Sequence, residues 1–157
     1  WLIDMTRGTP TRFTFDPASD QDPVWSPDGS RIVFSSDRDG PLNLYQKTAT
    51  GAGNEEALLK SDHAKVANDW SADGRFILYQ SSRDLWVLPL SGEQKPFPFL
   101  QTEFYEAQGR FSPDGKWIVY QSDQSGRYEI YVRPFPGAGT QWQISTDGGI
   151  HPVWRAG

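Results

Sequence analysis

Three aspartates stand at the same place in a repeated five-residue motif and are the first candidates for chemistry. The motif is an aromatic residue followed by Ser, Pro or Ala, Asp and Gly, and its copies are residues 25–29, 70–74 and 111–115. Gathered in one site, Asp28, Asp73 and Asp114 could bind a metal ion or transfer protons. However, Ser, Pro, Asp and Gly each suit one position of a tight turn that closes a β-hairpin. We therefore interpret these aspartates as turn residues.

A second recurring set lies three residues before each motif aromatic. Its members are Asp22, Ala67, Gln108 and His151, of which the last precedes Trp154. The set holds one carboxylate, one amide and one imidazole, which are possible metal ligands. Transition-metal sites usually contain several His or Cys ligands, and this set contains a single histidine. We therefore interpret these side chains as solvated polar groups and predict no bound metal.

Nucleophilic catalysis and phosphate binding have little support in this sequence. No Gly-x-Ser-x-Gly motif occurs, and the two histidines are His151 and His63, which lies in a polar loop. The glycines at 51–53 and 137–139 lack the Gly-Lys-Ser/Thr ending of a phosphate-binding loop. We predict that this segment is not an enzyme and carries no cofactor.

The composition suits many short strands joined by turns. The 157 residues include 7 Trp, 6 Tyr and 9 Phe together with 15 Gly and 12 Pro. A net charge of −5 without a basic patch argues against nucleic acid and anionic membranes as partners. No apolar run approaches the ~20 residues of a membrane span, and the absence of cysteine excludes disulfides. The chain opens on Trp1 without a signal peptide, so we expect a piece of a longer protein.

The motif recurs at a spacing that indicates a repeat architecture. Trp25 and Trp70 are 45 positions apart, Trp70 and Phe111 are 41 apart, and Trp154 follows 43 further on. The segment after each motif, such as residues 31–35, is apolar on both alternating faces and is expected to be buried on both sides. Four antiparallel strands per repeat, each sheet needing neighbours on both faces, are the blades of a β-propeller.

The repeats divide the chain into three complete blades with partial blades at both ends. Within one propeller segment over residues 1–157, we expect the last two strands of a preceding blade, three blades and the first strand of a further blade at residues 1–15, 16–60, 61–100, 101–146 and 147–157. This is too few blades to close a ring. The segment is therefore expected either to belong to a larger ring or to self-associate, with the strand around Trp154 of one copy joining the sheet of Trp1 of another.

These repeats resemble a known family. The motifs, the hairpins at 36–40 and 122–126 and the Leu-Tyr and Ile-Tyr pairs that follow them resemble TolB-like, WD-repeat-like propeller repeats over nearly the whole chain. In their residue types, these motifs are most similar to the propellers that follow the kinase domain of some bacterial serine/threonine protein kinases. The second repeat departs from the pattern, because four positions separate Ser82 from Trp86 where nine separate Ser36 from Tyr45.

The resemblance carries expectations about function. It implies that the strand before each motif is innermost, so that Asp22, Gln108 and His151 face a central channel. It implies a non-catalytic protein-interaction or ligand-sensing module of a larger bacterial protein such as a receptor-like kinase. A protein or peptide partner is expected, and a periplasmic or extracytoplasmic location is slightly favoured. The alternatives are the propeller of a prolyl-oligopeptidase-type hydrolase or a metal-dependent lyase, and a self-assembling repeat unit.

An aromatic group on the outer side of the second repeat is a further candidate for binding. Phe97 and Phe99 lie on an outer strand, and Phe104 and Tyr105 lie on the connection after it. Aromatic patches of this kind are common in protein interfaces. Packing between neighbouring blades is the alternative explanation, and the sequence leaves both open.

Overall fold

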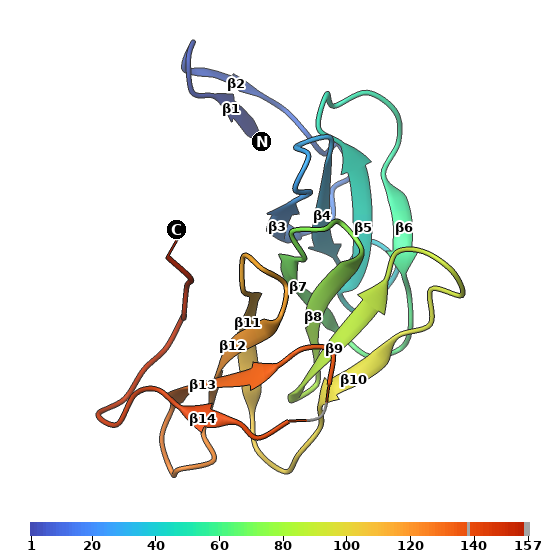
Figure 1. The fold of residues 1–157 in the computed structure, drawn as a ribbon. Coiled ribbons are helices and arrows are strands. Elements are labelled where there is room, and N and C mark those ends of the chain that lie inside the picture. Colours follow the sequence, from blue (N-terminus) through green and yellow to red (C-terminus); the bar gives the residue numbers. More distant parts are fainter. Residues whose placement is uncertain (138, 156–157) are drawn as a thin grey trace.

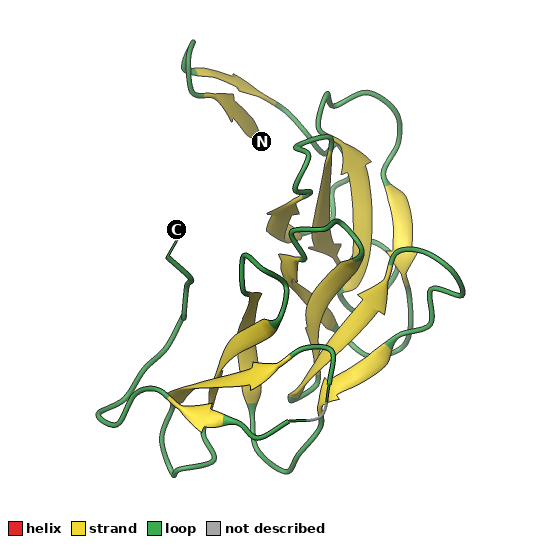
Figure 2. Ribbon diagram, viewed as in Figure 1, coloured by secondary structure: helices red, strands yellow, loops and turns green. Residues whose placement is uncertain are grey.

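The fold is built from short antiparallel strands joined by turns. A computed structural model describes residues 1–137 and 139–155, and within these ranges it contains no helix (Figure 2). None of the described chain is therefore a helix long and apolar enough to cross a membrane. The strands are β1 (Leu2–Asp4), β2 (Thr9–Thr11), β3 (Asp20–Trp25), β4 (Arg31–Ser36), β5 (Asn43–Thr48), β6 (Glu56–Leu59), β7 (Lys65–Trp70), β8 (Phe76–Ser81), β9 (Asp84–Pro89), β10 (Phe97–Leu100), β11 (Glu106–Phe111), β12 (Trp117–Ser122), β13 (Glu129–Pro134) and β14 (Trp142–Gln143).

Twelve of these strands form three four-stranded sheets in which each strand pairs with its neighbour in sequence. Blade 1 is β3-β4-β5-β6, blade 2 is β7-β8-β9-β10 and blade 3 is β11-β12-β13-β14, while β1 and β2 pair only with each other. Figure 1 shows the three blades fanned out, with β3, β7 and β11 on their inner side. The expected antiparallel propeller fragment, with about three complete blades and a partial blade, is confirmed.

The repeated motif closes the first hairpin of each blade as its residue types predict. In the first copy the Ser26 hydroxyl donates to Asp28 Oδ1 at 2.6 Å, and the Gly29 N–H donates to the Ser26 carbonyl at 2.9 Å. Gly29 has φ +68, a left-handed conformation that glycine adopts without steric penalty. Hydrogen bonds to Ser26 and Ser30 lower the pKa of Asp28 to about 2. The motif aspartates therefore stabilise their own turns.

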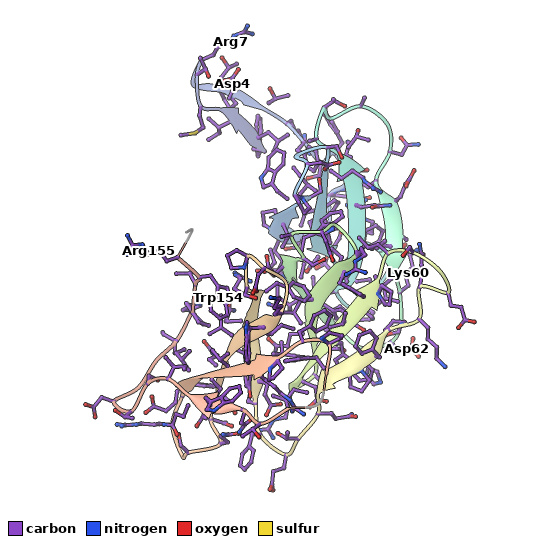
Figure 3. All side chains as sticks on the ribbon, in the orientation of Figure 1. Asp4, Arg7, Lys60, Asp62, Trp154 and Arg155 are labelled. Atoms are coloured by element: carbon purple, nitrogen blue, oxygen red, sulfur yellow. The ribbon has the colours of Figure 1, made fainter. Side chains whose placement is uncertain are left out.

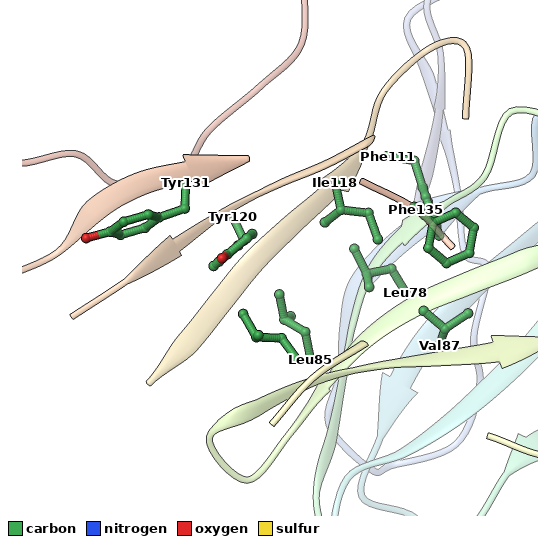
Figure 4. Packing of buried hydrophobic residues seen from close by; sticks show 9 residues of the cluster. Leu78, Leu85, Val87, Phe111, Ile118, Tyr120, Tyr131 and Phe135 are labelled. Carbon is green, nitrogen blue, oxygen red and sulfur yellow. The ribbon is translucent and has the colours of Figure 1, made fainter. Parts of the chain in front are cut away.

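The core lies between the blades, and the second strand of the middle blade, β8, is covered on both faces. Leu78 and Ile77 are neighbours in β8, and both have no exposed surface. Leu78 packs toward blade 3 with Ile118 and Tyr120 (Figure 4). Ile77 packs toward blade 1 with Val33. Successive residues of a strand point to opposite faces, so a strand between two packed sheets carries apolar residues at successive positions, as β8 does at Phe76–Leu78.

Two places where the repeats depart from their pattern have a structural description. The short connection after Ser82 is a two-residue turn, in which Ser81 pairs with Asp84 and Ser82 adopts φ +59. No strand forms around Trp154 in the described part of the C-terminal segment, so the described chain has 14 strands rather than the 15 expected. A strand needs a pairing partner, and no neighbouring strand pairs with residues 152–155.

Candidate functional site

Each inner strand contains a β-bulge at the place where the recurring polar set was predicted. The pairing of β3 with β4 skips between Gln21 and Val24, and the pairing of β11 with β12 skips between Ala107 and Arg110. A bulge of this kind bends the strand and re-aims a side chain, and bulges are common beside functional sites. The inner strands therefore carry a local distortion that repeats from blade to blade.

Three residues of the polar set share an unusual backbone conformation. Asp22, Gln108 and His151 have φ of 52°, 55° and 52°, in the left-handed region that costs a residue with a side chain about 1 kcal/mol. At two of the four positions of the recurring set, the backbone N–H also donates a hydrogen bond to a neighbouring blade. The His151 N–H donates to Gln121 Oε1 of blade 3 at 3.0 Å, and the Ala67 N–H of blade 2 donates to Ser35 Oγ of blade 1 at 2.9 Å.

The side chains of the polar set remain accessible. Asp22 and His151 are exposed and Gln108 is partly exposed. Partial desolvation raises the pKa of the Asp22 carboxyl, while the positive charge of Arg110 opposes this shift across the inner face. Asp22 and Gln108 lie on the first strands of their blades, β3 and β11, whereas His151 lies in the segment after β14, outside any strand.

Arg110 and its neighbours were missed by sequence reasoning. Arg110 Nη1 donates to the Asn68 carbonyl of blade 2, and the Trp154 indole N–H donates to the Arg110 carbonyl at 3.0 Å. Asp69 Oδ2 accepts the Phe111 N–H at 2.8 Å, and burial raises the pKa of the Asp69 carboxyl. One feature of the sequence could have indicated these residues. A charged residue, Asp69 or Arg110, directly precedes the motif aromatic in the second and third repeats, whereas Val24 precedes it in the first.

The inner face offers hydrogen-bonding groups more readily than metal ligands. Asn68 is buried, and its Oδ1 has no hydrogen-bond partner in the protein. Across residues 1–137 and 139–155, no group of three His, Cys, Asp or Glu side chains is arranged to hold a metal ion. The arrangement suits recognition of a polar surface by a carboxylate, an amide, a guanidinium and an imidazole.

The aromatic group of the second repeat lies at the junction of blades 2 and 3. Phe97 and Phe99 are partly buried against the shared core, and the Phe99 ring lies 6.2 Å from the Phe135 ring. The Tyr105 hydroxyl accepts a hydrogen bond from Gln80 Nε2 at 2.7 Å, while Phe104 is partly exposed beside it. Packing between blades accounts for Phe97 and Phe99.

Comparison with known proteins places this geometry in a family. The family model described as the TolB beta propeller domain matches residues 1–88. The Tol-Pal system protein TolB of Bordetella pertussis (strain Tohama I) is 30% identical over 118 residues, covering 73% of this chain. The uncharacterized peptidase YuxL of Bacillus subtilis (strain 168) is 24% identical over 179 residues, covering 84% of this chain. The chain spans 27% of the length of each of these relatives.

A solved structure shares the arrangement of the blades. The putative TolB from Agrobacterium tumefaciens superimposes with a TM-score of 0.83 at 23% sequence identity, covering 92% of this chain and 54% of that one. The family model covers more than half of this chain, and the superposition shows the same fold. The chain belongs to the TolB beta propeller domain family.

Proposed function

We propose that this chain is a non-catalytic protein-interaction or ligand-sensing propeller module that acts as part of a longer bacterial protein, such as a receptor-like kinase. The observation that carries the proposal is the repeated bulge on the inner strands. Asp22 and Gln108 take a left-handed conformation there, and His151, which lies outside any strand, takes the same conformation at the equivalent position of the C-terminal segment. Polar side chains fixed on a rigid sheet recognise a partner with little loss of conformational entropy.

The comparisons give this proposal further support. The Bordetella pertussis relative is by its name a component of the Tol-Pal system, which is consistent with a protein partner. Arg110 and Asp22 supply both charge signs on the inner face, and opposite charges on a binding surface favour a defined orientation of the partner. A protein or peptide segment with donors and acceptors of its own is the expected ligand.

The test removes the side chains and keeps the backbone. Glycine tolerates the left-handed conformation, so Asp22→Gly, Gln108→Gly and His151→Gly in one triple variant should leave the bulges intact. Gln94→Gly is a matched control, because Gln94 is exposed on an outer loop with φ 46. A partner is first captured by crosslinking to the wild-type chain and identified by mass spectrometry, and its affinity is then measured with purified components.

The two variants should separate the inner face from the rest of the surface. The triple variant should bind the purified partner at least about tenfold more weakly, equivalent to about 1.4 kcal/mol. The Gln94→Gly control should bind like the wild type. Equal affinity of the triple variant and the wild type would refute an inner-face binding site.

A hydrolase propeller that controls substrate access is the second candidate function. It is favoured by the similarity to the YuxL peptidase over 84% of this chain. In that case the catalytic residues would lie on a separate domain, and this segment would again carry none. The coding sequence that flanks residues 1–157 distinguishes the two functions, because it would encode a hydrolase domain rather than a kinase domain.

A further inference from the structure

The innermost strand of each complete blade begins with a charged residue. These residues are Asp20 in β3, Lys65 in β7 and Glu106 in β11, and each pairs with the last residue of the second strand of its own blade. Lys65 is 3% exposed and Glu106 has no exposed surface. A charged group that is removed from water is normally paired with an opposite charge or bound to a metal ion. The three positions can therefore be compared by asking what compensates each charge.

Blade 1 compensates its charge with an arginine that blade 3 lacks. Arg38 Nη2 donates to Asp20 Oδ1 at 2.9 Å, and the two side chains form an ion pair. Arg38 is the third residue of the Ser-Asp-Arg triplet at 36–38, which begins the hairpin after β4. The equivalent triplet of blade 3, at 122–124, ends in Gln124. Blade 3 therefore holds no arginine at the position from which blade 1 neutralises its carboxylate.

At the junction of blades 1 and 2, an ammonium group lies in a site made of oxygen atoms. Figure 3 labels Lys60 and Asp62, which flank Ser61 on the connection from β6 to β7. Lys65 Nζ donates to three oxygens of blade 1 and this connection, namely Asn43 Oδ1 at 2.9 Å, Ser61 Oγ at 2.5 Å and the His63 carbonyl at 2.7 Å. These acceptors are uncharged, so the chain itself supplies one positive charge to a neutral set of ligands.

The junction of blades 2 and 3 repeats the backbone of this site. The Lys65 N–H donates to the Leu42 carbonyl at 2.7 Å, and the Glu106 N–H donates to the Arg83 carbonyl at 2.8 Å. In both connections the hydroxyl four residues before the charged residue accepts the N–H two residues further on, at 3.3 Å and 3.0 Å. The equivalent pairs are therefore Asn43 and Asp84, Ser61 and Thr102, His63 and Phe104, and Lys65 and Glu106.

The side chains at the second junction have the opposite charge. Asp84 takes the place of an amide, and Glu106 takes the place of the ammonium group. A third carboxylate lies nearby, because Asp123 Oδ1 accepts the N–H of Tyr105, the residue before Glu106, at 2.9 Å. Glu106 Oε1 accepts the Thr102 hydroxyl at 2.5 Å, whereas Oε2 is buried without a hydrogen-bond partner.

No cation of the described chain neutralises this group. Within residues 1–137 and 139–155, neither Asp84 nor Glu106 forms an ion pair, and the exposed Arg83 forms none either. The second junction thus keeps the oxygen ligands of the first, adds two carboxylates and has lost the built-in positive charge. An unpaired, fully buried carboxylate oxygen at such a place indicates an external cation.

We propose that the junction of blades 2 and 3 binds a divalent cation with the ligand preference of Ca²⁺, at the place that the Lys65 ammonium takes at the preceding junction. Asp84 and Glu106 supply carboxylate oxygens, Thr102 its hydroxyl and Phe104 its main-chain carbonyl. Ca²⁺ takes oxygen ligands of these kinds in flexible geometry and adds water. Two carboxylates match its double charge, as the neutral acceptors around Lys65 match a single one.

The proposed site differs from the metal sites considered above. Two of its ligands are a hydroxyl and a carbonyl, so it does not consist of three His, Cys, Asp or Glu side chains, a grouping that residues 1–137 and 139–155 lack. Thr102 is exposed and Asp84 is partly exposed, which leaves the ion a route from solvent. Asp84 belongs to blade 2 and Glu106 to blade 3. The bound ion therefore joins two blades and stabilises the folded state alone.

The experiment measures calcium binding and stability on the 157-residue chain after treatment with a chelator. Isothermal titration calorimetry with CaCl₂ gives the dissociation constant and the number of ions per chain. Urea denaturation at pH 7 follows, in CaCl₂ or in NaCl of the same ionic strength. Glu106→Gln and Asp84→Asn each remove one carboxylate, and Glu103→Gln is the matched control, because Glu103 is exposed on the same connection. The double variant Asp84→Asn/Glu106→Lys recreates the side chains of the Lys65 site.

The wild type and the Glu103→Gln control should bind one Ca²⁺ per chain. At a concentration 100-fold above the dissociation constant, Ca²⁺ should raise their ratio of folded to unfolded protein about 100-fold over that in NaCl. Glu106→Gln and Asp84→Asn should lose most of this rise. The double variant should fold and show no response to Ca²⁺, because its own ammonium group fills the site.

Three results would overturn the proposal. The first is a wild type that neither binds Ca²⁺ in the calorimeter nor gains stability from it. The second is a gain in NaCl equal to that in CaCl₂, which would show that general screening of charge is sufficient. The third is an undiminished response of folded Glu106→Gln or of the folded double variant, which would place the ion elsewhere.

Discussion

A buried carboxylate at the junction of blades 2 and 3 should make the stability of the protein depend on pH. Glu106, the first residue of β11, has no exposed surface, and its Oε2 has no hydrogen-bond partner. Burial raises the pKa of the Glu106 carboxyl, and the negative charges of Asp84 and Asp123 raise it further. A hydrogen bond from the Thr102 hydroxyl to Oε1 at 2.5 Å and the charge of Arg83 oppose this shift in part.

The sign of the effect follows from the direction of the shift. A raised pKa means that the folded state binds the Glu106 proton more tightly than the unfolded state does. The free energy of unfolding therefore falls as pH rises from the unfolded value near 4.5 through the folded pKa. An unpaired buried polar group costs about 1–3 kcal/mol, and Glu106→Gln removes the charge while keeping the acceptor for Thr102. The variant should thus be about 1–3 kcal/mol more stable at pH 7.

Urea denaturation followed by tryptophan fluorescence measures this difference at a series of pH values. The advantage of Glu106→Gln should be largest near neutral pH and should shrink toward zero below pH 4.5, where wild-type Glu106 is protonated in both states. Glu103→Gln is a suitable control, because Glu103 is exposed on the same connection. A variant that is less stable than the wild type at pH 7, or a difference that does not change with pH, would contradict the reasoning.

Three further substitutions test the turns, the junctions and the repeat equivalence by urea denaturation. Ser26→Ala removes a buried hydroxyl that bonds two turn groups and should cost about 1–2 kcal/mol, so a neutral effect would show that the turn does not depend on it. Gly109→Ala would bring a Cβ to 2.6 Å from Leu78 Cδ2 and should cost about 1–3 kcal/mol by overpacking, and unchanged stability would mean that Leu78 yields freely. Trp70 is 6% exposed, and Trp70→Ala should lower the free energy of unfolding by about 3–5 kcal/mol. Trp25 occupies the equivalent site but is 51% exposed, so Trp25→Ala should cost less than half as much. Equal losses would contradict the assigned burial.

The repeats predicted most of the fold because their signals are local. The turn motif fixes where each first hairpin closes, and the apolar residues on both faces of β8 require a sheet on either side. Neither signal depends on distant parts of the chain. The strand expected around Trp154 depends on a partner strand instead, and the described chain pairs none with it.

The recurrence of the polar set could be read from the sequence, whereas its backbone conformation could not. Asp22, Gln108 and His151 were found by their equal spacing from the motif aromatic. Their left-handed backbone could not be read from residue type, because it accompanies the bulges of β3 and β11 at Asp22 and Gln108 and a hydrogen bond to Gln121 of blade 3 at His151. Arg110 was missed for the same reason, since its partner Asn68 belongs to another repeat, 42 residues away. Likewise, composition alone could not say whether the Phe97 side of blade 2 was covered.

Amide hydrogen exchange tests most directly whether neighbouring blades bury both faces of each central strand. β8 lies in the middle sheet with blade 1 on one side and blade 3 on the other, so its amides should exchange more slowly than those of any other strand, at a rate set by global unfolding. The β1–β2 hairpin should exchange fastest. Exchange of the β8 amides as fast as those of β1 and β2 would contradict the stacked-blade account.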